Sequence, residues 1–226
     1  MSYARTLMTV LVLVTFGFVA RVAGPGSAAV QSVAAAEGLR NTVARLEGSA
    51  DSGDDELDAR YRVRADLDGS TVYAETSDQV EAVAWALGRF AAAGLALPNV
   101  EVRYHSDYSG CASTDGDAGT RAGYLAYGGG NFVVYLCGTR FTLLHELAHV
   151  WDVSALTDEV RAEFLVLRDA DAWSHDTWAR AGGEHLADVV AWGLQEDNVR
   201  PSRTKPNDDA SLYEAYVAAT GSEPLS

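Results

Sequence analysis

Apolar residues occupy every second position in several short runs of the first half of the chain. Such alternation is typical of β-strands with one buried face. Asp68-Gly69 separates the first two runs and is a hairpin-turn signal, and three glycines at 128–130 separate the last two. We therefore predict two hairpins and one further strand, over 61–65, 71–74, 100–105, 122–127 and 131–136.

In other segments, apolar residues recur at the three- to four-residue period of amphipathic helices. A first helix is expected to begin after a cap at Thr76 or Ser77 and to end near Gly94. Four more helices are predicted after the strands, over 141–152, 157–169, 183–195 and 209–219. This order predicts an α+β domain, with a small antiparallel or mixed sheet packed on the first of these four helices.

The first 29 residues have the pattern of a secretory signal peptide. A weakly basic start precedes an apolar run over 7–20, which is short for a membrane span, and the small residues Ser27-Ala28-Ala29 follow. We expect cleavage and secretion, with a retained anchor on the outer face of the membrane as the alternative. Residues 30–59 are expected to form a peripheral helix and an acidic linker, and residues 60–226 the folded domain.

Composition narrows the classes of partner. The chain has 17 Lys and Arg against 32 Asp and Glu, and its formal net charge of -15 disfavours nucleic acid and anionic membranes. An apolar content of 48% is ample for a packed core. The two cysteines, Cys111 and Cys137, are expected to form a disulfide, because exported proteins fold in oxidising surroundings.

The candidate chemistry lies in the segment Phe141 to Asp152, which reads F-T-L-L-H-E-L-A-H-V-W-D. On a helix, His145 and His149 share one face, and Glu146 directly follows the first of them. The remaining residues are apolar nearly all round, so these three polar groups should be buried, which costs free energy unless they have partners. A zinc ion bound by both histidines, with Glu146 turned toward an activated water, would supply the partners.

A catalytic zinc site needs a third protein ligand. Glu184 and Asp188 lie four residues apart at the start of a predicted buried helix and share one face. Glu184 can bind the metal, while Asp188 accepts a hydrogen bond from a ligand imidazole, which we expect to be that of His145. The alternative third ligands are His185, His175 and Asp171.

The chain resembles the zincin metallopeptidases of the glutamate-ligand, thermolysin-like (gluzincin) branch. These proteins have an H-E-x-x-H motif on one helix and, on another helix, a Glu followed four residues later by an Asp. The pattern corresponds here to His145, Glu146, His149, Glu184 and Asp188. The resemblance implies a zincin-like fold in which the histidines and the second glutamate bind zinc, the first glutamate is the general base and the aspartate supports a ligand. The chain also resembles exported actinobacterial proteins with such a helix. The other major branch of zincins is excluded. Its members have Gly three residues and His six residues after the second motif histidine, where this chain has Asp152 and Ala155.

By this resemblance, we expect an exported zinc peptidase that hydrolyses a bond of a peptide or protein substrate with a metal-activated water. A donor to the developing oxyanion is required, and the candidates are Tyr213, Tyr216, His175 and His185. Zincins bind extended substrates along an edge strand, so 131–136 is expected to be that edge. The alternatives are a non-catalytic zinc-binding envelope protein and a zinc amidase acting on cell-wall peptides.

Overall fold

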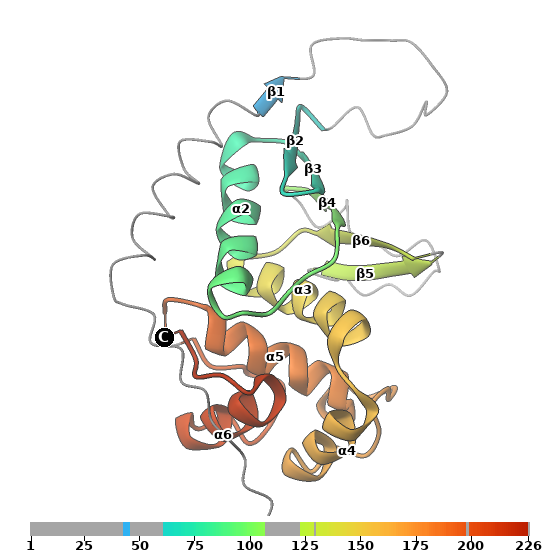
Figure 1. The fold of residues 1–226 in the computed structure, drawn as a ribbon, viewed down its shortest axis with the longest axis vertical. Helices are drawn as coiled ribbons and strands as arrows, with labels where there is room; N and C mark the ends of the chain where they lie inside the picture. Colours follow the sequence, from blue (N-terminus) through green and yellow to red (C-terminus); the bar gives the residue numbers. More distant parts are fainter. Residues whose placement is uncertain (1–42, 46–60, 107–122, 129, 198, 226) are drawn as a thin grey trace, which may run out of the picture.

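The structure, a computed structural model, describes residues 43–45, 61–106, 123–128, 130–197 and 199–225. They form an α+β fold with one mixed sheet and five α-helices (Figure 1). The strands are β1 (Val43–Arg45), β2 (Val63–Leu67), β3 (Ser70–Ala74), β4 (Val100–Tyr104), β5 (Gly123–Gly128) and β6 (Asn131–Leu136). The helices are α2 (Ser77–Ala92), α3 (Arg140–Ala155), α4 (Asp158–Leu167), α5 (Gly182–Leu194) and α6 (Asp209–Thr220), with a short 3-10 turn at Trp178–Arg180.

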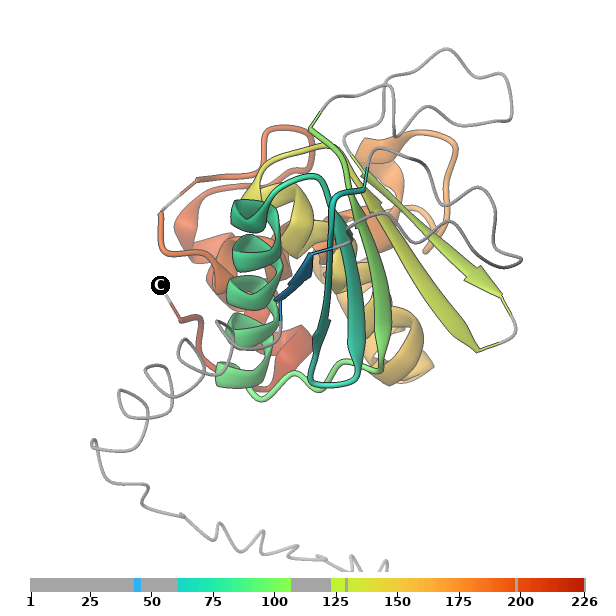
Figure 2. The same ribbon diagram turned by 90° about the horizontal axis from the view of Figure 1, so that it is seen from above.

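Helices α2 and α3 pack against the sheet, and α5 packs against the side of α3 that faces away from it (Figure 1, Figure 2). Alternate residues of β2, β3 and β4 are buried while those between them are exposed or half-buried, so one face of the sheet forms the core. The core continues between α3 and α5 as far as α6. Because α3 lies between two layers, it is apolar nearly all round.

The predicted elements are confirmed at nearly the expected positions, and the sheet order is β1-β2-β3-β4-β6-β5. Strands β3, β4 and β6 run parallel, and the other pairs are antiparallel. Strand β6 therefore lies inside the sheet, and β5 forms the edge next to it among the described strands. The expectation that residues 131–136 are the edge is wrong. Phe132, Val134 and Leu136 are buried on β6, and pairing on both sides suits this more apolar strand of the hairpin.

The turn between β2 and β3 has the backbone that its sequence predicts. Asp68 and Gly69 both have positive φ, 47° and 89°, as a tight two-residue hairpin turn requires. Residues 43–45, predicted to belong to a peripheral helix, instead form β1 and pair antiparallel with β2. The backbone of β2 offers unpaired N–H and C=O groups at this side of the hairpin, and an extended segment satisfies them where a helix cannot.

Several sequence predictions fall on other parts of the chain. The predicted signal segment, 1–29, and Cys111 lie outside the described residues, so secretion and the disulfide stay predictions. Cys137 is buried directly after β6. Among the helices of the described residues, none is long and apolar enough to cross a membrane.

Helices α5 and α6 approach closely at Gly193. A Cβ atom placed on this residue would lie 2.2 Å from the ring of Tyr216, a distance that real Cβ contacts do not reach. Tyr216 is fully buried, so its ring cannot move into solvent to make room. Glycine is therefore required here by close approach of two helices.

We expect Gly193→Ala to lower the free energy of unfolding by about 1–3 kcal/mol, because the added methyl group overpacks the contact with Tyr216. Gly88→Ala is the matched control, since Gly88 lies on exposed α2 surface with nothing within 4 Å of the added Cβ. This control should raise stability by about 0.5–1 kcal/mol through helix propensity. Urea denaturation of both variants measures the difference, and equal effects would contradict the packing described.

Candidate metal centre

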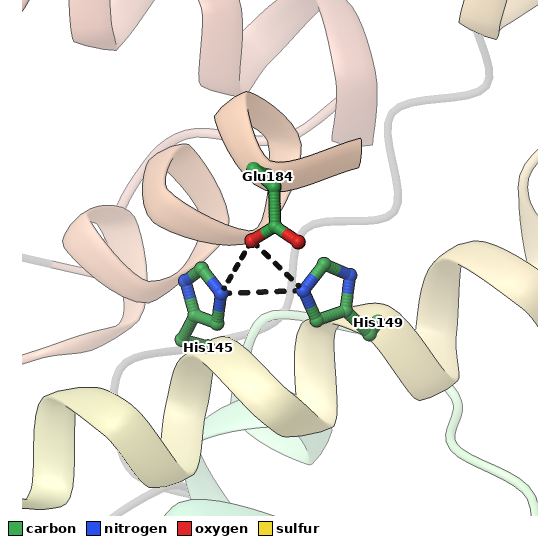
Figure 3. Close-up of side chains that lie close together, drawn as sticks. All are labelled: His145, His149 and Glu184. Carbon is green, nitrogen blue, oxygen red and sulfur yellow. Dashed lines mark hydrogen bonds and ion pairs between the residues drawn. The ribbon is translucent and has the colours of Figure 1, made fainter. Parts of the chain in front are cut away.

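Two residues of α3 and one of α5 form a compact group of metal-ligand type (Figure 3). His145 and His149 lie one turn apart on α3, and Glu184 lies in the first turn of α5. The Nε2 atom of His145 is 3.1 Å from Oε2 of Glu184 and 3.2 Å from Nε2 of His149. The distance from the latter nitrogen to Oε2 of Glu184 is 3.4 Å. One atom of each residue thus points into the same small space.

Asp188, one turn after Glu184 on α5, contacts the other nitrogen of the His145 ring. Its Oδ1 lies 3.0 Å from Nδ1 of His145, and its Oδ2 accepts a hydrogen bond of 2.8 Å from the hydroxyl of Thr204. An ionised carboxylate only accepts hydrogen bonds, so Nδ1 of His145 is the donor. In the neutral imidazole, Nε2 then carries a lone pair that faces Glu184 and His149.

Atoms with lone pairs therefore converge between α3 and α5. Nε2 of His145 and Oε2 of Glu184 are both acceptors, and at 3.1 Å they repel unless a proton or a cation lies between them. Two imidazole nitrogens and one carboxylate oxygen are the donor set of a zinc site with three protein ligands. The Asp188 contact adds the carboxylate that commonly supports a ligand histidine. The side chains present thus fit a zinc ion.

The pKa values show how the metal-free group balances its charges. Burial by itself lowers the pKa of His145, but its hydrogen bonds with Asp188 and Glu184 outweigh burial and raise the pKa to about 10. Burial likewise raises the pKa of Glu184, but hydrogen bonds from His145 and His149 lower it to about 2. At neutral pH, the His145 imidazolium therefore pairs with the Glu184 carboxylate, and the proton between them occupies the space where a metal cation would fit.

Glu146 lies beside this group, because it directly follows His145 on the buried face of α3. Its side chain is buried, and its negative charge contributes to the raised pKa of His145. Within the described part of the chain, the metal-ligand group consists of the two histidines and Glu184 and does not include Glu146. A buried carboxylate next to a ligand set can act as a general base.

A pocket of about 500 Å³ opens beside the group and is lined by His149 and Glu184. Its other walls come from the end of α3, from Arg161 of α4 and from residues 173–175 before α5. The space adjoins two of the ligand-type side chains and is large enough for an amino-acid side chain. The pocket therefore offers room beside the candidate metal centre for part of a bound molecule.

Asp152 joins three segments at one wall of this pocket. Its Oδ1 accepts a hydrogen bond of 2.9 Å from Nε of Arg161, and its Oδ2 accepts one of 2.8 Å from Nε1 of Trp173. The guanidinium of Arg161 also lies over the Trp173 ring, 5.5 Å from its centroid. Since Asp152 is buried and both of its oxygens are bonded, it is a structural support of the wall.

The structure places the three alternative ligands outside the metal-ligand group. Nε2 of His185 donates a 2.9 Å hydrogen bond to the carbonyl of Ala179, which holds the buried ring against the backbone before α5. Asp171 forms an ion pair with Arg180. His175 lines the pocket, and its Nδ1 accepts a hydrogen bond from the backbone N–H of Thr177. Of the three, only His175 lines the pocket beside the candidate centre.

Two candidate oxyanion donors lie on α6, away from the pocket. The hydroxyl of Tyr213 donates to Glu223 at the exposed surface, and Tyr216 is buried against Gly193 near the end of α5. His185, the third candidate, is held by a backbone carbonyl. None of these three residues lines the pocket. The sequence could not show this, because an aromatic or imidazole side chain on a helix carries no local signal of which neighbour it faces. His175 is the remaining candidate.

Two residues near the site carried no recognisable signal in the sequence. Trp178 stacks on the His145 ring, with centroids 5.3 Å apart and an interplanar angle of 16°. Thr204 is fully buried and bonds Asp188 from a segment between α5 and α6. Trp178 begins a single 3-10 turn and Thr204 lies in an irregular segment, and both stretches are too short for hydrophobic periodicity to show.

The opposite pKa shifts in the group make the stability of the metal-free protein depend on pH. The raised pKa of His145 contributes stability that is fully present below its unfolded value of 6.5 and lost as the pH rises through about 10. The lowered pKa of Glu184 contributes stability that is present above 4.5 and lost as the pH falls through about 2. The pair should therefore stabilise the metal-free fold most between pH 4.5 and 6.5.

Denaturation of chelator-treated protein at a series of pH values measures this effect. The profile of His145→Gln is the reference, because that variant lacks the titrating imidazole while other groups remain. The stability difference between wild type and variant should shrink as the pH rises above 6.5. A difference that stays constant up to pH 10 would contradict the assignment of the proton to His145.

Comparison with known proteins gives no family assignment for this arrangement. Neither protein-family models, nor curated proteins, nor solved structures match the chain. The function is therefore inferred from the geometry and chemistry of the described residues.

Proposed function

We propose that the chain is a zinc-dependent peptidase with a zincin-like fold. The observation that carries this proposal is the convergence of lone pairs from His145, His149 and Glu184, with Asp188 bonded to the far nitrogen of one histidine. A purely structural zinc site usually has four protein ligands, whereas three leave a position for a reactant. Glu146 next to a three-ligand set favours catalysis over a structural role.

In this proposal His145, His149 and Glu184 would hold the zinc ion, which when bound would act as a Lewis acid that acidifies water and polarises a carbonyl. Glu146 takes a proton from the attacking water and delivers it to the leaving amine. Asp188 keeps the proton of His145 on Nδ1 and so keeps Nε2 available as a ligand atom. The scissile peptide bond is thereby cleaved to a carboxylate and an amine.

The edge of the sheet suggests how an extended substrate is held. Strand β5 stands at the end of the sheet order of the described strands, and it contacts α3, the helix with both histidines. A peptide added to the outer side of β5 would gain backbone hydrogen bonds. One of its side chains would enter the pocket beside His149 and Glu184. This assigns to β5 the role that the sequence analysis gave to residues 131–136.

His175 is the donor that we assign to the developing oxyanion. Its Nδ1 accepts the N–H of Thr177 at 2.9 Å, so the proton of the neutral ring is on Nε2. This nitrogen lies 3.8 Å from Oδ2 of Asp171, so the role requires that it turn from that carboxylate toward bound substrate. His175 lines the pocket together with His149 and Glu184. An N–H donor at this wall can stabilise negative charge on a carbonyl oxygen bound at the centre.

Export of the enzyme remains a proposal that rests on the apolar run at 7–20 and the small residues after it. Secretion, or anchoring to the outer face of the membrane, would place the active site outside the cell. A disulfide between Cys111 and Cys137 is consistent with that location. A net charge of -15 supports a peptide or protein substrate over nucleic acid.

Glu146→Gln should retain zinc and lower kcat on a mixed peptide library by about 10²–10⁴-fold, because the amide cannot accept the proton of water. Zinc content is measured by elemental analysis, and cleavage by mass spectrometry with and without a chelator. Glu163→Gln is the matched control, since Glu163 is an exposed residue of α4.

These experiments separate the peptidase from the other candidate functions. Stoichiometric zinc without chelator-sensitive cleavage of any peptide would favour a zinc-binding envelope protein. Cleavage restricted to cell-wall peptides would favour the amidase. Full activity of the Glu146→Gln enzyme would exclude Glu146 as the base.

His175→Phe should lower kcat by about 10²–10³-fold with unchanged zinc content, because it removes one donor to the oxyanion. Tyr213→Phe is the control, since it removes a candidate hydroxyl that is bonded to Glu223 instead. Steady-state kinetics on a cleaved peptide measures kcat and KM separately. A change in KM alone would show that His175 only contacts bound substrate.

A further inference from the structure

The segment Arg203–Pro206, between α5 and α6, reaches His145 along two routes. One route runs through Asp188 to a ring nitrogen, and the other runs through Trp178 to the ring face. The segment contributes no member of the metal-ligand group. Its contacts nevertheless bear on the orientation of one proposed zinc ligand.

The first route is a chain of two hydrogen bonds. The Thr204 hydroxyl donates to Oδ2 of Asp188 at 2.8 Å, and Oδ1 of the same carboxylate accepts from Nδ1 of His145 at 3.0 Å. Thr204 is fully buried and Asp188 is 5% exposed, so water has little access to either group. Removing the Thr204 hydroxyl would leave a buried carboxylate oxygen without this donor, and the carboxylate could then rotate.

The second route is a stack of planar groups. Trp178 lies nearly parallel to the His145 ring, 5.3 Å away, and the guanidinium of Arg203 lies over the Trp178 ring, 5.1 Å from its centroid. Trp178 is 36% exposed, so packing from the core alone does not fix its position. The cation over the ring holds Trp178 against the imidazole.

A buried arginine fixes the end of the segment. Nη2 of Arg168, from the C-terminus of α4, donates to the carbonyl of Pro206 at 2.6 Å, and the side chain is 1% exposed. The negative charges of Asp188 and Asp208 act on this guanidinium. Arg168 therefore ties the segment down and also offsets part of the charge of the buried Asp188.

We propose that Arg203–Pro206 is a positioning element for His145, with Thr204 as its principal positioning residue, and that it raises the affinity for zinc. The inference rests on the proposed zinc site. A ligand imidazole that keeps one rotamer and one tautomer loses less freedom when metal binds. Outer partners of ligand histidines change metal affinity by about 10–100-fold.

The test compares Thr204→Val, which removes the hydroxyl and keeps the shape, with Thr204→Ser, which keeps the hydroxyl. Thr71→Val is the matched control, because the Thr71 hydroxyl also donates to a carboxylate, that of Asp66, but on strand β3. Zinc dissociation constants are measured by competition with a chromophoric chelator. The visible spectrum of the cobalt-loaded protein reports the ligand geometry independently of catalysis.

Thr204→Val should bind zinc about 10–100-fold more weakly and show an altered cobalt spectrum. Thr204→Ser and Thr71→Val should remain close to wild type in both measurements. Unchanged affinity and spectrum in Thr204→Val would overturn the inference while leaving the zinc site in place. Wild-type protein that binds no zinc would instead overturn the proposed function.

Arg203→Gln provides a second variant if Thr204→Val does not fold, since Arg203 is exposed and its replacement spares the core. This variant should also bind zinc more weakly, because Trp178 loses the cation that holds it against His145. A folded Arg203→Gln protein with wild-type affinity and cobalt spectrum would overturn the stacking route.

Discussion

The structure depends on one electrostatic constraint, the burial of His145 between acceptors on both of its ring nitrogens. Asp188 contacts Nδ1, while Glu184 and His149 face Nε2. A single imidazole cannot satisfy all of these groups with one proton, so the site is balanced only when it gains a second proton or a metal cation. In the metal-free protein a second proton on His145 fills this role, and a metal cation would take its place among the same atoms. This arrangement is the strongest physical argument for a metal centre.

The arrangement of the helices brings these polar groups together in the core. Helix α3 lies between the sheet and α5, so its apolar residues form a core on both sides while one polar face is turned toward α5. Helix α5 places Glu184 and Asp188 against that face, although they lie about forty residues further along the chain than His145. The segments between and after these helices add Trp178 and Thr204, which contact the polar groups from outside the core. The site is thus shared among several elements, with three side chains from α3, two from α5 and one from each of the two other segments.

Two kinds of surroundings meet at the centre. A pocket beside His149 and Glu184 is bounded by Asp152, Arg161 and Trp173, whose mutual bonds hold three segments together. One face of the His145 ring is stacked against Trp178. In the proposed function, the pocket gives a reactant room beside the centre, and the stacked ring restrains the ligand histidine.

The sequence by itself determined the elements that depend on local pattern. Alternation and helical spacing predicted the strands and helices, and the separations of His145 from His149 and of Glu184 from Asp188 each predicted a shared helix face. Only the tertiary structure decided that the two faces meet, that β5 is the edge strand, and that Thr204 supports Asp188. The physical reason is that periodicity records which side of an element is buried, whereas its neighbour depends on packing between residues far apart in the chain.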